Sequence, residues 1–235
     1  MLPFYARHFD TLEIDSSFYG TPAISTVQRW YDCTPDDFRF ALKFPKTITH
    51  DKFLRGCDAE LAEFLRSADE LRDKLGPLLL QFPYFRQGEV RQEDFLGRLR
   101  DFLPSLPKDF SFAVEIRNRS WLGAETRDLL RERNIALALI DHPYMSRPAE
   151  LLELDPLTAD FTYVRLLGDR LGIEEKTKVW DQVIEDRTPE LREWVDVCRA
   201  ITRRGLSTHV YVNNHYAGHA PATVRAFLRM WKSQE

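Results

Sequence analysis

The stretch Thr11-Leu12-Glu13-Ile14-Asp15 alternates apolar and acidic side chains. Successive side chains of a β-strand point to opposite faces, so Leu12 and Ile14 share one face and Glu13 and Asp15 share the other. In a barrel of parallel strands, one face of each strand packs on outer helices and the other points inward. The stretch therefore predicts a barrel strand whose two carboxylates face the inside.

Six further runs of apolar and aromatic residues, bounded by turn signals, also read as strands. With residues 10–15, the predicted strands are 38–44, 77–82, 110–117, 135–141, 161–166 and 207–213. Helical periodicity lies between them, most clearly at 58–74, 189–204 and 220–231. Strands that alternate with helices predict a parallel sheet, and we expect an α/β fold of the TIM-type (β/α) barrel kind, as a single domain over residues 1–235.

Polar residues at the ends of the later strands support a barrel. The residues that we place on the inner face with Glu13 and Asp15 are Lys43, Gln81, Glu115, Arg117, Asp141, Arg165 and Asn213. A doubly wound sheet has helices on both faces and would not easily accept so many charges on one of them. No predicted strand is followed by the Gly-x-Gly-x-x-Gly turn of dinucleotide-binding sheets.

The strand count falls one short, because about seven strands are predicted and a closed barrel needs eight. Residues 2–9 read as the tail of a helix that runs into the first predicted strand. We therefore expect that the first strand of the barrel is missing, and that Met1 is internal to a longer protein or the chain was cut. A true seven-stranded variant is the alternative.

Composition limits the class of protein. The 235 residues carry 33 basic and 37 acidic side chains, for a net charge of -4, which argues against generic binding to nucleic-acid phosphates and leaves a local basic pocket open. Cys33, Cys57 and Cys198 form no Cys-x-x-Cys pair, so we expect neither a thiolate zinc site nor an oxidising compartment. No apolar stretch approaches the roughly 20 residues of a membrane span, and we expect a cytosolic protein.

Several blocks recur in one order along nearly the whole chain. They are residues 10–19 followed by a Trp-bearing helix, 38–43, 75–83, 113–117 with Ser120 and Trp121, 163–166 and 210–214. This set resembles the YecE-like family, also called domain of unknown function 72, and the resemblance implies a TIM barrel without naming a reaction. That family normally opens with a Gly-Thr-Ser-Gly-Trp-type strand, which is absent here, and Asp15 stands where asparagine is commoner.

The inner face offers candidates for proton transfer. Glu115 is the best candidate for a general acid or base, because a neighbouring carboxylate would raise its pKa and Arg117 would lower it. Lys43, crowded by arginines, suits a proton carrier or a Schiff-base nucleophile, unless it stays paired with Glu13 or Glu115. Glu13 and Asp15 lie about 6.6 Å apart, a spacing that permits a two-carboxylate glycosidase. The candidate catalytic residues are Lys43, Glu115, Glu13 and Asp141.

Other residues suit ligand binding. Arg117 and Arg165 can bind a carboxylate or phosphate through paired hydrogen bonds. The loop 214–221 leads into a helix N-terminus, which favours phosphate. Loop aromatics can stack on a sugar or base, or merely cap the core. The candidate binding residues are Asp15, Tyr19, Gln81, Arg117, Trp121, Arg165, Asn213, Asn214 and Gly218. Residues 142–160 show no clear helix and are a candidate lid.

We therefore expect binding or acid/base transformation of a small anionic molecule, phosphorylated, carboxylated or sugar-like, at the carboxyl end of the barrel. Such a protein would be a cofactor-independent hydrolase, lyase or isomerase, if it is an enzyme. We expect no metal, because the cations repel a divalent ion and histidines do not end the strands. The alternatives are a closed salt-bridge network, a non-catalytic ligand- or nucleic-acid-binding barrel, and a metal-dependent nuclease-like hydrolase.

Overall fold

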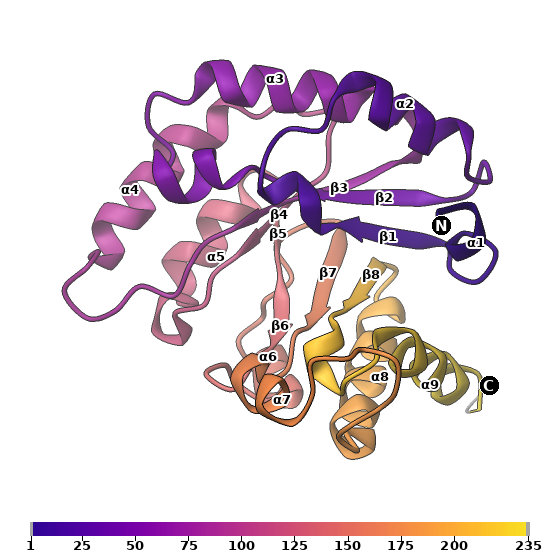
Figure 1. Ribbon diagram of the computed structural model, residues 1–235. Helices are drawn as coiled ribbons and strands as arrows, with labels where there is room; N and C mark the ends of the chain where they lie inside the picture. The colour runs from indigo at the N-terminus through magenta and orange to yellow at the C-terminus, as the bar shows by residue number, and fades with distance from the viewer. Residues whose placement is uncertain (1, 234–235) are drawn as a thin grey trace. The chain divides into compact units, whose positions relative to one another are not determined.

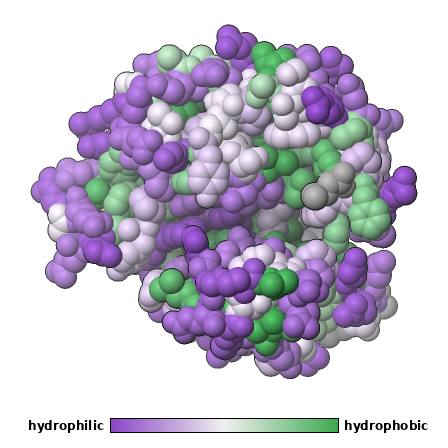
Figure 2. Space-filling view, in the orientation of Figure 1, coloured by the Kyte–Doolittle hydropathy of each residue, from purple (hydrophilic) through white to green (hydrophobic). Residues whose placement is uncertain are grey.

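The computed structural model describes residues 2–233 and divides into two compact units, Met1–Ile116 and Arg117–Glu235. On the face seen in Figure 2, hydrophilic residues predominate and hydrophobic ones form separate small areas, as on an ordinary protein surface. Within the described residues, no helix is both long and apolar enough to span a bilayer.

The first unit is built on four parallel strands that lie side by side in chain order (Figure 1). Its strands are β1 (Thr11–Ile14), β2 (Arg39–Lys43), β3 (Leu75–Gln81) and β4 (Phe112–Glu115). Its helices are α1 (Leu2–Tyr5), α2 (Ile24–Asp32), α3 (Asp58–Asp69) and α4 (Gln92–Phe102). The predicted strands 10–15, 38–44, 77–82 and 110–117 are thus present, each with ends shifted by one or two residues.

Packing of the helices decides which face of this sheet is polar. Phe44, directly after β2, lies against Phe64 of α3 with ring centroids 4.7 Å apart. Leu42 and Leu80 share this side of the alternation and are fully buried. Lys43, between Leu42 and Phe44, therefore points to the opposite face, as predicted.

The second unit has two very short strands, two strands of six residues, and the longest of the described helices. Its strands are β5 (Ala136–Leu137), β6 (Leu139–Asp141), β7 (Phe161–Leu166) and β8 (Ser207–Val212), of which β6, β7 and β8 are parallel neighbours. Its helices are α5 (Ala124–Arg131), α6 (Pro148–Glu153), α7 (Arg170–Lys176), α8 (Thr188–Thr202) and α9 (Ala220–Lys232). Figure 1 shows α8 and α9 beside β8. The predicted run 135–141 is present but interrupted at Ala138, and the other two strands match closely.

The candidate lid 142–160 was expected to lack a helix, and this is wrong: Pro148 starts the six-residue helix α6, whose Leu151 is buried. A proline at the first helical position is favourable, since its missing N–H needs no partner there. The proposal that Met1 is an internal residue concerns a position outside the described residues.

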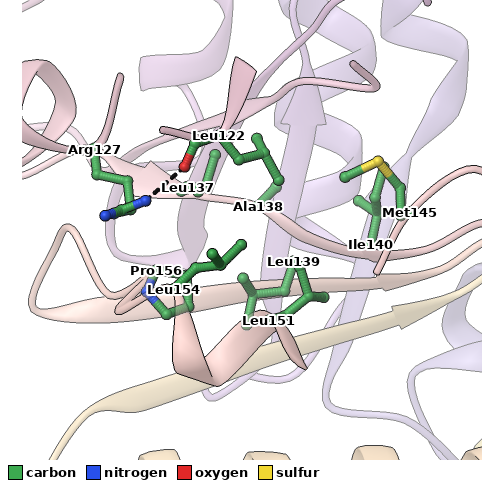
Figure 3. Close-up of a pocket in the computed structure, with 10 residues that line it drawn as sticks. All are labelled: Leu122, Arg127, Leu137, Ala138, Leu139, Ile140, Met145, Leu151, Leu154 and Pro156. Atoms are coloured by element: carbon green, nitrogen blue, oxygen red, sulfur yellow. Dashed lines mark hydrogen bonds between the residues drawn. The ribbon is translucent and has the colours of Figure 1, made fainter. Parts of the chain in front are cut away.

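Leu151 also lines a small cavity in the second unit, which Figure 3 shows beside β5 and β6. Nine of its ten lining residues are apolar, and the tenth, Arg127, donates a hydrogen bond to the carbonyl of Leu122 at 2.7 Å. The cavity has a volume of about 10 Å³, about the space for one water molecule. It is a packing defect of the core, too small for a substrate.

Candidate functional site

Lys43 is a buried cation at the carboxyl end of β2. Its side chain is 8% exposed, and its Nζ donates to Asp15 Oδ1 at 2.9 Å. The Asp15 side chain is 65% exposed, so the pair opens to solvent through the carboxylate. Nζ also lies over the ring of Phe18, 4.5 Å from its centroid, a favourable cation–π contact.

Ser17 holds the backbone of Lys43 in place. Strand β1 ends at Ile14, one step before it would pair with Lys43. The buried hydroxyl of Ser17 takes over, since it accepts from Lys43 N at 2.9 Å and lies 2.9 Å from Lys43 O and 2.7 Å from Ile14 O. Ser17 is therefore a positioning residue for the ammonium, which the sequence reading did not single out.

Three aromatic rings lie near the Lys43 ammonium or contact a ring that does. Tyr19 is 73% exposed and stands edge-on to Phe18, with centroids 5.4 Å apart. The rings of His50 and Phe18 also lie edge to face, with centroids 5.0 Å apart, and His50 Nδ1 lies 2.8 Å from the hydroxyl of Thr49. Together with Asp15 and Lys43, the residues Phe18, Tyr19 and His50 form what we call the Lys43 cluster.

His50 was missed by sequence reasoning. It lies in a π-helical turn, Thr47–Asp51, after the end of β2. Such turns are rare in proteins, and those that occur are often found at functional sites. No residue pattern in the sequence predicts them. Only the spacing of six residues from the end of the predicted strand 38–44 could have drawn attention to it.

The other predicted polar residues of the first unit share the face of Lys43. Glu13 is the register partner of Ala41, two residues before Lys43 on β2. Gln81 is the register partner of Glu115, and both are buried. Gln81 Nε2 donates to the carbonyl of Phe82 at 2.6 Å, so the amide is partly committed to the backbone.

In the second unit, Arg165 lies where the alternation predicts and is 4% exposed. Its register partners are Ile140 on β6 and Tyr211 on β8, so these three residues share one face of the sheet. Asp141 is the register partner of Leu166 and lies on the other face. The prediction that Asp141 shares the face of Arg165 is therefore wrong.

The physical reason for this placement is that α8 and the residue just before it supply partners for the Asp141 carboxylate. Trp194 Nε1 donates to Asp141 Oδ2 at 2.6 Å, and Arg187 Nη2 lies 3.2 Å from Oδ1. Arg187 also stacks on the buried ring of Tyr216, 4.7 Å from its centroid. Burial, reinforced by Asp141, raises the pKa of Tyr216 well above its usual range. This group ties the segment before α8 to β6, and Tyr216 packs in the core.

Asn213 and Asn214 serve mainly local hydrogen bonds. Asn213 Oδ1 accepts from His215 N at 2.9 Å and lies 2.6 Å from His215 Nδ1, while His215 Nε2 lies 3.0 Å from Glu174 Oε1. Both ring nitrogens of His215 are therefore engaged by side chains of the same unit, Asn213 and Glu174.

The predicted phosphate loop is already filled by the protein. Asn214 Oδ1 accepts from Ala220 N at 2.8 Å, and Pro221 has no N–H to offer, so neither of the first two residues of α9 has an open amide. Gly218 has φ +104°, and a side chain there would meet Gln182 and Ile184 within 3 Å. Gly218 is thus explained by backbone conformation and close packing.

Arg117 and Trp121 follow β4 in the chain. Arg117 is half-buried, and Trp121 is 8% exposed within the 3-10 turn Arg119–Trp121. The carbonyl of Trp121 accepts from the hydroxyl of Thr126 at the start of α5. Trp121 therefore packs in the core, as the alternative for loop aromatics had it.

Two further observations concern the thiols and the clustering of metal-ligating side chains. Burial raises the pKa of the Cys198 thiol to about 12, which leaves almost no thiolate at neutral pH. Within residues 2–233, no three His, Cys, Asp or Glu side chains gather in a way that could hold a metal ion.

Comparison with known proteins adds a family and a fold. The family described as "Protein of unknown function DUF72" matches residues 1–235. UPF0759 protein YecE of Escherichia coli K12 is 38% identical over 150 residues, which cover 61% of this chain and 52% of YecE. The match thus spans about half the length of this curated relative.

Solved structures agree on the architecture. A DUF72 family protein from Enterococcus faecalis V583 is similar with a TM-score of 0.75 and 22% identity, covering 97% of this chain and 92% of that one. A D-psicose 3-epimerase matches with a TM-score of 0.58 and 11% identity, over 90% of this chain and 77% of that one. At these identities the likeness shows the fold alone, and the fold is the TIM-type β/α barrel class.

Proposed function

The chain belongs to the DUF72 family, and from its side chains we propose that it binds a small anionic or sugar-like molecule at the Lys43 cluster and exchanges protons with it. Lys43 is the group that contacts the ligand. Glu115, buried at the end of β4 on the same face as Lys43, is the second proton carrier. Glu13 supplies a further carboxylate on that face.

One observation carries this proposal. An ammonium has three N–H donors. Within the described residues, Asp15 is the one hydrogen-bond acceptor for Lys43 Nζ, although the side chain is 8% exposed. A buried ammonium with unfilled donors is costly, because burial removes the water that would satisfy them. A ligand oxygen at this position satisfies the remaining donors.

The second unit, taken by itself, has candidates of its own. We propose Arg117 and Arg165 as binding residues for an anionic group, since a guanidinium matches carboxylate and phosphate geometry. Asn213 retains its amide nitrogen for a ligand, because its oxygen is occupied by His215. We assign Asp141 to holding Arg187 and Trp194, in place of the catalytic role predicted from sequence.

The test is ligand binding by the full chain and by Lys43→Met, which keeps the length of the side chain and removes its charge and donors. Inorganic phosphate, D-gluconate, glucose 6-phosphate and D-glucose are titrated, with binding followed by ligand-observed NMR and by the rise in melting temperature. We expect at least one of them to bind the wild type and to lose at least tenfold in affinity with Lys43→Met, about 1.4 kcal/mol.

Lys46→Met is the matched control, because Lys46 is exposed and lies three residues further along the chain. Asp15→Asn is a second variant in case Lys43→Met fails to fold, since Asp15 is largely exposed and its replacement keeps the size of the side chain while it removes the negative charge beside Lys43. If no compound of the panel binds, or if Lys43→Met binds as the wild type does, the proposal is wrong. A ligand recovered unchanged after long incubation would assign binding without catalysis.

A further inference from the structure

The charge of the Lys43 cluster points to a narrower class of ligand. Lys43 already has a counter-ion, since Asp15 Oδ1 lies 2.9 Å from its Nζ. A free anion that approached the ammonium would also approach this carboxylate, and the repulsion offsets much of the attraction. The pair is neutral as a unit, and neutral polar groups meet no such penalty.

The same pair presents both kinds of hydrogen-bonding group. The ammonium keeps N–H donors beyond the one given to Asp15, and a carboxylate accepts at two oxygens. The Asp15 side chain is 65% exposed, so its accepting positions are open to a ligand. A hydroxyl can accept from the ammonium while a neighbouring hydroxyl donates to the carboxylate, and adjacent hydroxyls are what a sugar ring offers.

Tyr19 adds a flat apolar surface beside this pair. It is 73% exposed, although large aromatic side chains usually bury most of their surface. Its orientation is supported by Phe18, whose ring contacts both Tyr19 and the Lys43 ammonium, at 5.4 and 4.5 Å between centres. Phe18 thus links the exposed Tyr19 ring to the Lys43–Asp15 pair. Ligand sites commonly combine such an apolar wall with a few polar groups that fix orientation.

We propose that the ligand of the Lys43 cluster is a sugar ring, with adjacent hydroxyls on the Lys43–Asp15 pair and its apolar face on Tyr19. This inference rests on the proposed function and names its substrate class. It assigns recognition to the hydroxyls and the ring, and makes a phosphate or carboxylate group unnecessary for binding.

The experiment compares neutral and anionic probes on the full chain. D-glucose, D-fructose and D-xylose are titrated by ligand-observed NMR, beside inorganic phosphate and glycerol, which lack a ring. We expect at least one sugar to bind more tightly than phosphate and glycerol, with little change when salt is added, because a neutral ligand is not screened. Tyr19→Ala should weaken sugar binding about fivefold, whereas Tyr19→Phe should keep it.

Phe4→Ala is the matched control. Phe4 is an aromatic residue of the same unit with 67% exposure, in α1 before the opposite end of β1, and its loss should leave sugar binding unchanged. If phosphate binds through Lys43 while all three sugars do not, or if Tyr19→Ala binds sugar as the wild type does, this inference is wrong and the broader function stands. If neither sugars nor anions bind, both are wrong.

Discussion

The position of the Lys43 backbone depends on the hydroxyl of Ser17. Ser17→Ala would leave Lys43 N and the nearby carbonyls without their partner in a buried place. An unsatisfied buried backbone group costs about 1–3 kcal/mol, so we expect the free energy of unfolding to fall by that amount. Urea unfolding followed by circular dichroism measures it.

Ser16→Ala is the control for this prediction. Ser16 is the adjacent residue of the same turn and is exposed, so its replacement should change stability by less than about 0.5 kcal/mol. Equal stability of the two variants would show that water replaces the hydroxyl of Ser17 without cost. Lys43 would then be held by its own side chain and by strand β2.

Asp141 shows where reading single residues from the sequence fails. The alternation gives the relative faces of neighbours, and it placed Lys43 and Arg165 on the faces that the structure shows. For Asp141, both preceding residues are apolar, so the sequence does not tell which side meets a helix. The face of Asp141 is set by Trp194, more than fifty positions away, whose indole N–H donates a hydrogen bond to the carboxylate. Such long-range partners leave no local pattern.

At the scale of elements, the end of α2 is stabilised from outside the helix. The last carbonyls of a helix lack partners within it and carry partial negative charge. Lys74, 2% exposed, donates from Nζ to the carbonyls of Tyr31 and Thr34 at 2.6 and 2.7 Å. Its ammonium also lies 4.3 Å from the centroid of the Tyr31 ring.

We predict that Lys74→Met lowers the free energy of unfolding by about 2–3 kcal/mol, because methionine fills the space of the side chain but supplies no donor. Denaturant unfolding is the measurement. Lys108→Met, at an exposed position of the same unit, should be close to neutral. A loss of less than about 0.5 kcal/mol for Lys74→Met would mean that the carbonyls find other donors.

The elements themselves were largely predictable. All seven predicted strands are present because each combines apolar runs with turn signals, and these depend on nearby residues alone. The break at Ala138 and the short helix α6 were not foreseen. Both lie beside the small cavity, and packing around a cavity is set by side chains from several segments.

At the scale of the whole molecule, the fold class followed from the alternation of strands and helices, and the family from blocks in a fixed order. The residues of the candidate site could be predicted from the sequence only in part. Lys43, Glu13 and Glu115 share a face by simple alternation, whereas Phe18, His50 and Ser17 join Lys43 through short irregular turns. Irregular backbone is fixed by tertiary packing, so the sequence did not reveal the cluster.

The stability of the molecule should depend on pH through His209 on β8. Burial lowers the pKa of His209 below its ordinary value of 6.5, so the unfolded chain binds a proton more readily than the folded one. The contribution is therefore fully present above about pH 6.5 and is lost as the pH falls toward the lowered pKa. We expect the melting temperature to drop as the pH falls below about 6.5, and to drop less in His209→Gln, which cannot take up the proton. His8→Gln, at an exposed position, should follow the wild type. An identical pH profile for His209→Gln would show that other groups govern acid stability.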